Sequence, residues 1–206
     1  MTLLAMLRHG ETPWTAAGRL QGRTDIPLDD AARRAFASWS LPEELQHLPV
    51  VSSPLLRCRQ TAQSLGLTDI QVEPRLTEMA WGRWEGQTLA SLRAQFGEAL
   101  QANEARGLDF RPDGGESPRE VLERVRPWLA EIGADGRAHL AVCHRGVIRV
   151  VFAWALGWDM RGKPPARLDW RCLQLFDIDA QGVPTVARLN LPLARRTAGA
   201  DLPSQG

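Results

Sequence analysis

The sequence has few cysteines, little net charge and no long apolar run. Its three cysteines (Cys58, Cys143 and Cys172) match neither a metal-binding spacing nor a disulfide framework. The formal net charge of +1 gives no electrostatic reason to expect nucleic acid or a membrane surface as a partner. No run is apolar for long enough to span a bilayer, and the apolar N-terminal stretch is too short for a signal peptide. We therefore expect a cytoplasmic protein that binds neither nucleic acid nor membrane.

The composition and patterning that are present indicate a globular α/β protein. Hydrophobic residues make up 44% of the 206 residues and charged residues 24%, which are ordinary values. Short apolar runs alternate with amphipathic segments, which predicts one three-layer α/β sandwich over residues 1–206 with a mostly parallel central sheet flanked by helices. The predicted strands are 3–7, 49–52, 70–73 and 139–143, and a closing hairpin of 172–178 and 183–189. The predicted helices are 29–40, 54–65, a helix from 118 and 147–156.

Two helix starts carry sequence signals. In "GGESPRE", Ser117 is placed to be the N-cap, Pro118 the first helical residue and Glu120 the second half of a capping box. In "SSPLLR", Ser53 and Pro54 predict a helix start in the same way. The second start lies directly after a predicted strand, so its unpaired N–H groups should face the same edge of the sheet as the strand end.

Charged and nucleophilic side chains follow three of the predicted strands. Arg8 and His9 leave the first strand, Ser53 and Arg57 follow the second, and His144 follows the fourth. Parallel strands end at one edge of a sheet, where α/β proteins bind their ligands. We therefore expect these groups to form one site.

This set of residues suits phosphoryl transfer. Arginine binds phosphate oxygens with a planar fork of donors, and a histidine with one fixed ring nitrogen can attack phosphorus with the other. A leaving alkoxide needs a proton, for which Glu78 in "LTEMAWGRWEG" is the candidate, because burial beside Trp81 and Trp84 would raise its pKa. The arginines would repel a metal cation, so we expect no metal at this site. We expect no other cofactor either. We expect Arg149 to be turned away from this edge.

Six motifs in order resemble the histidine phosphatase superfamily, in its phosphoglycerate mutase-like branch. They are "LRHGET" (7–12), "GRLQGRTDIPL" (18–28), "SSPLLRCRQTA" (52–62), "LTEMAWGRWEG" (76–86), "GGES" (114–117) and "CHRGVIR" (143–149). The resemblance implies that His9 becomes phosphorylated, that Arg8, Arg57 and His144 bind the phosphate, and that Glu78 donates the proton. It also implies a phosphate contact from Gln21.

Two of the departures from the family pattern lie close to the candidate site residues, and one segment corresponds to the family's lid. Thr15 stands where the family often has Asn, and Arg145 where it often has a small residue. The Arg145 side chain either adds positive charge at the rim or points to solvent with only its N–H facing the site. Both positions are kept as candidates for phosphate or substrate binding. Residues 87–116 should form a small helical cap over the site. Such a short cap, with a brief polar tail after Leu193, favours hydrolysis over mutase chemistry, because water can reach the phosphorylated enzyme.

The leading hypothesis is a phosphomonoesterase of the histidine acid phosphatase type, acting on a small phosphorylated metabolite as a monomer or homodimer. A cofactor-dependent phosphoglycerate mutase is one alternative. A family member that binds phosphorylated ligands or a protein without catalysis is the other.

Overall fold

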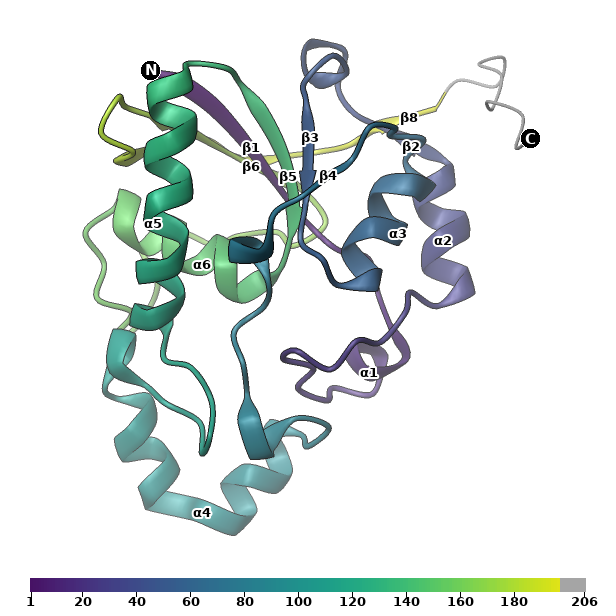
Figure 1. Ribbon diagram of the computed structural model, residues 1–206. Coiled ribbons are helices and arrows are strands. Elements are labelled where there is room, and N and C mark those ends of the chain that lie inside the picture. Colours follow the sequence, from purple (N-terminus) through teal and green to yellow (C-terminus); the bar gives the residue numbers. More distant parts are fainter. Residues whose placement is uncertain (197–206) are drawn as a thin grey trace.

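The computed structural model describes residues 1–196, in which strands alternate with helices along most of the chain (Figure 1). The tail after Leu193 lies outside this range from position 197 on. The strands are β1 Thr2–Arg8, β2 Trp39–Ser40, β3 Val50–Ser52, β4 Gln71–Val72, β5 His139–Cys143, β6 Leu173–Ile178, β7 Pro184–Leu191 and β8 Ala194–Arg195. The α-helices are α1 Pro13–Ala16, α2 Asp30–Ala37, α3 Leu56–Ser64, α4 Leu89–Glu104, α5 Pro118–Asp135 and α6 Arg145–Ala155. Short 3-10 helices cover η1 Glu43–Leu45, η2 Pro74–Leu76, η3 Gly82–Trp84 and η4 Gly107–Asp109.

The central sheet has six strands in the order β4-β3-β5-β1-β6-β7. The first four run parallel to one another. Strand β6 runs antiparallel to both of its neighbours, β1 and β7, and forms the expected hairpin with β7. The register pairs Arg8 with Cys143 and Ser52 with Val142, so β1, β5 and β3 end side by side. This sheet, flanked by helices, confirms the predicted α/β class.

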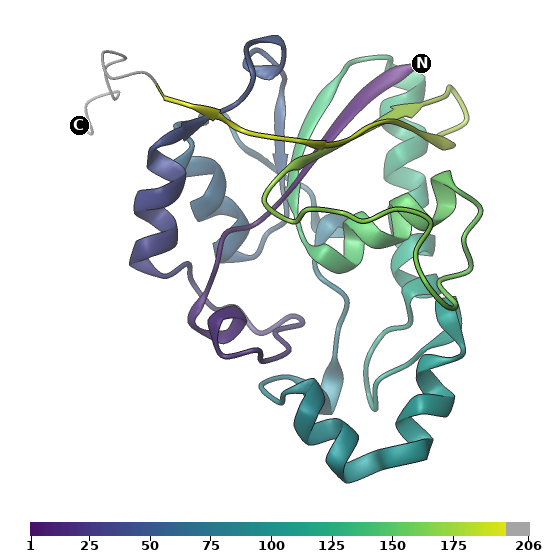
Figure 2. The ribbon, with the colours of Figure 1, turned by 180° about the vertical axis from the view of Figure 1, so that it is seen from behind.

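Side-chain alternation along the strands builds two apolar layers. In β1, Leu4 and Met6 pack into the core formed with α5 and α6. Ala5 and Leu7 point to the opposite face and pack with residues from the α2–η1 region. Figures 1 and 2 show α2 and α3 on one side of the sheet, α5 and α6 on the other, and α1 and α4 beyond the end of β1. The segment that contains α4 therefore lies outside the three layers, beyond the carboxyl edge of the sheet.

Three helix predictions were wrong at a boundary. The helix predicted over 147–156 is α6, which begins two residues earlier, at Arg145, and ends at Ala155. The helix predicted over 29–40 ends at Ala37, because Trp39 and Ser40 pair with the distant strand β8. The helix predicted from Pro54 begins at Leu56. The Ser53 hydroxyl accepts from the Leu55 N–H only at 3.4 Å and lies 2.7 Å from His144 Nε2. The Leu56 N–H donates to the Asp25 carboxylate at 2.7 Å, so a residue from another segment caps this helix.

The start of α5 was predicted correctly. Ser117 is its N-cap, Pro118 is its first residue and Glu120 closes the capping box. The segment between Gln87 and Glu116 holds α4 and η4, and α4 is kinked at Gly97, whose φ is 48°. Only a residue without a side chain adopts that backbone conformation without strain, so the bend in α4 depends on this glycine.

Candidate active site

His9 lies at the end of β1 as a neutral, oriented imidazole. Its Nδ1 is 2.7 Å from the Gly10 carbonyl oxygen, which can only accept, so Nδ1 carries the proton and Nε2 has a free lone pair. The Gly10 N–H donates to the Thr61 hydroxyl at 2.9 Å, which fixes this turn against α3. Burial, followed by the charges of Arg8 and Arg57, lowers the pKa of His9 well below its ordinary value. The side chain therefore has the properties of a nucleophile at neutral pH.

His144 lies at the end of β5, directly beside His9. The two ring centroids are 5.2 Å apart and the rings meet edge to face. His144 is fully buried, and its Nε2 lies 2.7 Å from the Ser53 hydroxyl and 3.3 Å from the Cys58 sulfur. Burial and the charge of Arg57 lower the pKa of His144 well below the usual value. This histidine lies behind the cavity wall rather than on its surface.

Two arginines present buried donors without partners. Arg57 is 0% exposed, and its terminal nitrogens donate to the carbonyls of Thr24 and Gly22 at 2.9 and 2.7 Å. Among residues 1–196, the Nε atoms of Arg57 and Arg8 have no hydrogen-bond partner. A buried N–H group without a partner costs roughly 1–3 kcal/mol, so an anion bound between these donors would remove that cost.

Glu78 faces the same cavity from the loop after η2. It is 8% exposed, and its carboxyl accepts N–H donations from Met79 at 2.9 Å and from Gly146 at 3.1 Å. Burial raises the pKa of this carboxyl, against the opposing effects of these N–H groups and of Arg57 and Arg8. A raised pKa keeps the acid form available at higher pH than for an exposed glutamate, as a proton donor requires.

These groups open into a cavity of about 800 Å³. Its wall is formed by the end of β1, the loop from Gly18 to Gly22, α3, α6 and the segment after residue 87. Six arginines line it against three glutamates: Arg8, Arg19, Arg57, Arg93, Arg145 and Arg149, and Glu11, Glu78 and Glu104. Trp81 and Phe110 form an aromatic wall, with ring centroids 5.7 Å apart. The charge excess suits an anionic ligand that is larger than phosphate alone.

The remaining candidate residues also lie on this cavity. Gln21 lines it and is buried, and its side-chain oxygen accepts from the Thr12 hydroxyl at 2.9 Å. Thr15 lines it too, although its hydroxyl is engaged in the capping box of α1 with Thr12. Arg145 lines it with its guanidinium over the Trp170 ring, 5.0 Å from the centroid.

The prediction for Arg149 was wrong. This side chain lines the cavity instead of facing away, because it follows Arg145 by one helical turn and shares its face of α6. The spacing of four residues was the available signal, and it was visible in "CHRGVIR". Thr61 was also missed as the residue that fixes the turn at Gly10, since that contact joins segments far apart in the sequence.

Neither a metal cluster nor a membrane-spanning helix is found in the part of the chain that the structure describes. Within residues 1–196, no three histidine, cysteine or acidic side chains are grouped to hold a metal ion. No helix in that range is long and apolar enough to cross a bilayer. Apart from three glutamates, the side chains that line the cavity around His9 are cationic or neutral, which agrees with anion binding.

Comparisons with known proteins identify similar chains and folds. The model of the histidine phosphatase superfamily (branch 1) matches residues 4–192. The glucosyl-3-phosphoglycerate phosphatase of Mycolicibacterium vanbaalenii is 36% identical over 176 residues, 78% of this chain and 77% of that protein. That of Mycobacterium tuberculosis is 36% identical over 165 residues, 73% of each chain. The solved structure of mycobacterial glucosyl-3-phosphoglycerate phosphatase with VO3 matches with a TM-score of 0.74 and 30% identity, over 94% of this chain and 100% of that one.

Proposed function

This chain belongs to the histidine phosphatase superfamily and is a phosphatase, and we propose that it hydrolyses a small phosphorylated metabolite through a phosphohistidine on His9. The family and the enzyme class expected from the sequence are thereby confirmed. The assignment of the individual residues is our proposal. The observation that carries it is a neutral His9 with a free Nε2, beside two buried arginine N–H groups that have no partner in residues 1–196.

The first half of the reaction transfers the phosphoryl group to the enzyme. His9 Nε2 attacks phosphorus, a P–N bond forms and the P–O bond to the leaving group breaks. Arg8 and Arg57 stabilise the charge on the equatorial oxygens, which is the main requirement of phosphoryl transfer. Glu78 gives its proton to the departing alkoxide, so that the product leaves as an alcohol and Glu78 remains as a carboxylate.

The second half releases inorganic phosphate. A water molecule attacks the phosphohistidine, and the Glu78 carboxylate takes a proton from it. The P–N bond breaks, which restores neutral His9 and protonated Glu78. His144, held through Ser53, packs edge to face against the ring of His9 from behind the cavity wall; it would reach the phosphoryl group only if its ring nitrogen left the Ser53 hydroxyl. Gln21, Thr15 and Arg145 contact the substrate from the cavity wall.

The proposed setting of the reaction follows from the surrounding structure. Residues 87–116 act as a cap inserted in a single domain 1–206, and Arg93 and Phe110 bring this segment onto the cavity. The relatives act, by name, on glucosyl-3-phosphoglycerate, so we expect a small acidic phosphomonoester here. The enzyme works in the cytoplasm, in agreement with its three free thiols, as a monomer or homodimer. It binds neither nucleic acid nor a membrane, in agreement with its net charge of +1.

The test of the nucleophile is to trap the intermediate. Acid-quenched incubation of the wild type with a ³²P-labelled phosphomonoester should leave label in a base-stable, acid-labile form. His9→Ala should lose both the label and turnover of p-nitrophenyl phosphate, whereas His47→Ala, which replaces an exposed histidine, should retain both. Turnover that persists in a folded His9→Ala protein contradicts the mechanism.

A second measurement separates hydrolysis from mutase chemistry. Phosphate release and enolase-coupled formation of 2-phosphoglycerate are followed in one sample of 3-phosphoglycerate with bisphosphoglycerate supplied. We expect phosphate release to dominate. Mutase flux well above phosphate release would contradict the assignment as a hydrolase.

A further inference from the structure

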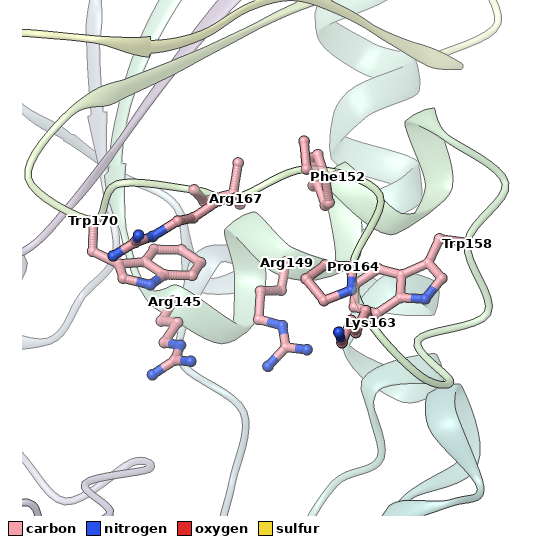
Figure 3. A pocket seen from close by; sticks show the side chains of 10 residues that line it. Arg145, Arg149, Phe152, Trp158, Lys163, Pro164, Arg167 and Trp170 are labelled. Carbon is pink, nitrogen blue, oxygen red and sulfur yellow. The ribbon is translucent and has the colours of Figure 1, made fainter.

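A second cavity, of about 610 Å³, adjoins the catalytic one. It lies between α6 and the loop from Trp158 to Trp170. Arg145 and Arg149 line both cavities, so the two spaces share a wall. Figure 3 shows the charged ends of Arg145, Arg149 and Lys163 pointing to one side of this loop. A ligand held at His9 therefore has this second cavity as its neighbour.

The second cavity is cationic without compensation. Arg145, Arg149, Lys163 and Arg167 line it, and no carboxylate does. None of these four forms an ion pair with any residue up to position 196, although eleven ion pairs occur elsewhere in that range. The whole chain has nearly equal numbers of acidic and basic residues, so this imbalance is local. Burial, and after it the charge of Arg145, lowers the pKa of Arg149.

Two tryptophans hold the arginines by their faces. The Arg145 guanidinium lies over the Trp170 ring at 5.0 Å, and the Arg149 guanidinium lies over the Trp158 ring at 5.6 Å from the centroid. Stacking uses the flat face of a guanidinium and leaves the N–H groups at its edge free to donate. The loop therefore orients the two arginines without consuming the donors that bind anions.

We propose that this cavity, here called the second-anion pocket (Arg145, Arg149, Lys163 and Arg167), binds a second anionic group of the substrate, a carboxylate or a phosphate. The proposal rests on the function proposed above, since it places the reacting phosphoryl group at His9. The shared wall favours one ligand that spans both cavities over two independent ligands. Phosphomonoesters with a second acidic group are then preferred over those without one.

The kinetic test uses substrate pairs that differ in the second anionic group. Glycerol 3-phosphate is compared with 3-phosphoglycerate for a carboxylate, and fructose 6-phosphate with fructose 1,6-bisphosphate for a phosphate. The double variant Lys163→Met/Arg167→Met removes two charges that line only the second-anion pocket. For 3-phosphoglycerate, fructose 1,6-bisphosphate or both, the kcat/KM of this variant should fall roughly tenfold to a hundredfold, which is the effect of losing a charge-assisted hydrogen bond. The fall should come mainly from a higher KM. The pair that responds identifies the group.

Controls separate this effect from a structural one. The double variant should lose no more than about twofold on the member of each pair that lacks the second group, since nothing there reaches the lost charges. Lys163→Arg should retain the preference, and Arg188→Met, at an exposed position on β7 outside both cavities, should match the wild type. Equal losses on both members of a pair, or no loss on either acidic member, overturn the proposal. Fructose 1,6-bisphosphate is also added to assays of p-nitrophenyl phosphate turnover. If it changes that turnover in the wild type but not in the double variant, while substrate preference is the same in both, the pocket binds an independent ligand and the proposal is overturned.

A labelling experiment tests the pocket without depending on catalysis. Lys163 is the only lysine in the sequence, so an amine-reactive ester can acylate only this side chain and the N-terminal amine. In His9→Ala, which cannot form the phosphohistidine, saturating 3-phosphoglycerate or fructose 1,6-bisphosphate should slow Lys163 acylation severalfold. Glycerol 3-phosphate should not, and the N-terminal amine should react at one rate throughout. Equal acylation of Lys163 with all three compounds excludes the pocket. Failure to trap a phosphohistidine in the wild type, with protection of Lys163 intact, would instead count against the proposed function alone.

Discussion

Gly146 offers a sharp test of Glu78, because a single added methyl group would displace the carboxyl. Gly146 lies in the first turn of α6, and its N–H donates to Glu78. A Cβ at this position would meet Glu78 Oε1 at 2.3 Å, well inside the 3.4 Å at which ordinary contacts begin. The carboxyl must then retreat by about 1 Å, a displacement of a catalytic group that can cost on the order of a hundredfold in rate.

The expected result of Gly146→Ala depends on the leaving group. Alkyl phosphates need a proton from Glu78, so their kcat should fall by on the order of a hundredfold. p-Nitrophenyl phosphate leaves without a proton, so its kcat should change by no more than about threefold. The helix itself should tolerate the change, because alanine is a better helix former than glycine.

A double-mutant comparison shows whether Gly146 acts through Glu78. Glu78→Gln should slow alkyl phosphates by a factor on the order of a hundred to ten thousand. The double variant Glu78→Gln/Gly146→Ala should then be no slower than Glu78→Gln, because the displaced group is already absent. Additive losses, or equal slowing of aryl and alkyl phosphates by Gly146→Ala, would refute this reasoning.

Three further predictions concern pH, metal ions and stability. For an alkyl phosphate, kcat should fall as pH rises through the elevated pKa of Glu78, because the acid form of Glu78 is lost. On the acid side kcat should fall only well below pH 6.5, because the pKa of His9 is depressed. A pH–rate profile that keeps its alkaline limb in Glu78→Gln would contradict the assignment. EDTA should leave phosphate release unchanged, since arginines surround the phosphoryl position and repel cations; activity lost in EDTA and restored by a divalent ion would oppose this. Ser117→Ala should cost about 1 kcal/mol of unfolding free energy by removing the N-cap of α5, and Ser117→Thr should retain most of it in denaturant titration.

The sequence by itself determined the class of fold and the position of the candidate site. Strand β5 was predicted with its observed bounds, His139–Cys143, because a run of apolar residues between polar ones is a local signal. The capping box at the start of α5 was an equally local signal, because Ser117, Pro118 and Glu120 lie within four residues. Arg8, His9 and His144 were identified as site candidates because each lies at the end of a buried strand, and parallel strands end at one edge.

Only the tertiary structure decided features that depend on contacts between distant segments. The first turn of α3 is capped by Asp25, and Ser53 is drawn to His144, so the local cap signal at Ser53 lost to two long-range hydrogen bonds. The tautomer of His9 and the unpartnered N–H groups of Arg8 and Arg57 follow from atomic positions that no sequence spacing specifies.

The second-anion pocket is the clearest case of this kind. Lys163 and Arg167 lie in a loop with no periodic pattern, and their relation to Arg145 and Arg149 arises only when that loop packs on α6. A sequence shows where charges lie along the chain, but whether they share a cavity depends on how the chain folds back. Here the loop from Trp158 to Trp170 returns to the helix, stacks its tryptophans on the two arginines, and brings the remaining cations to the same space.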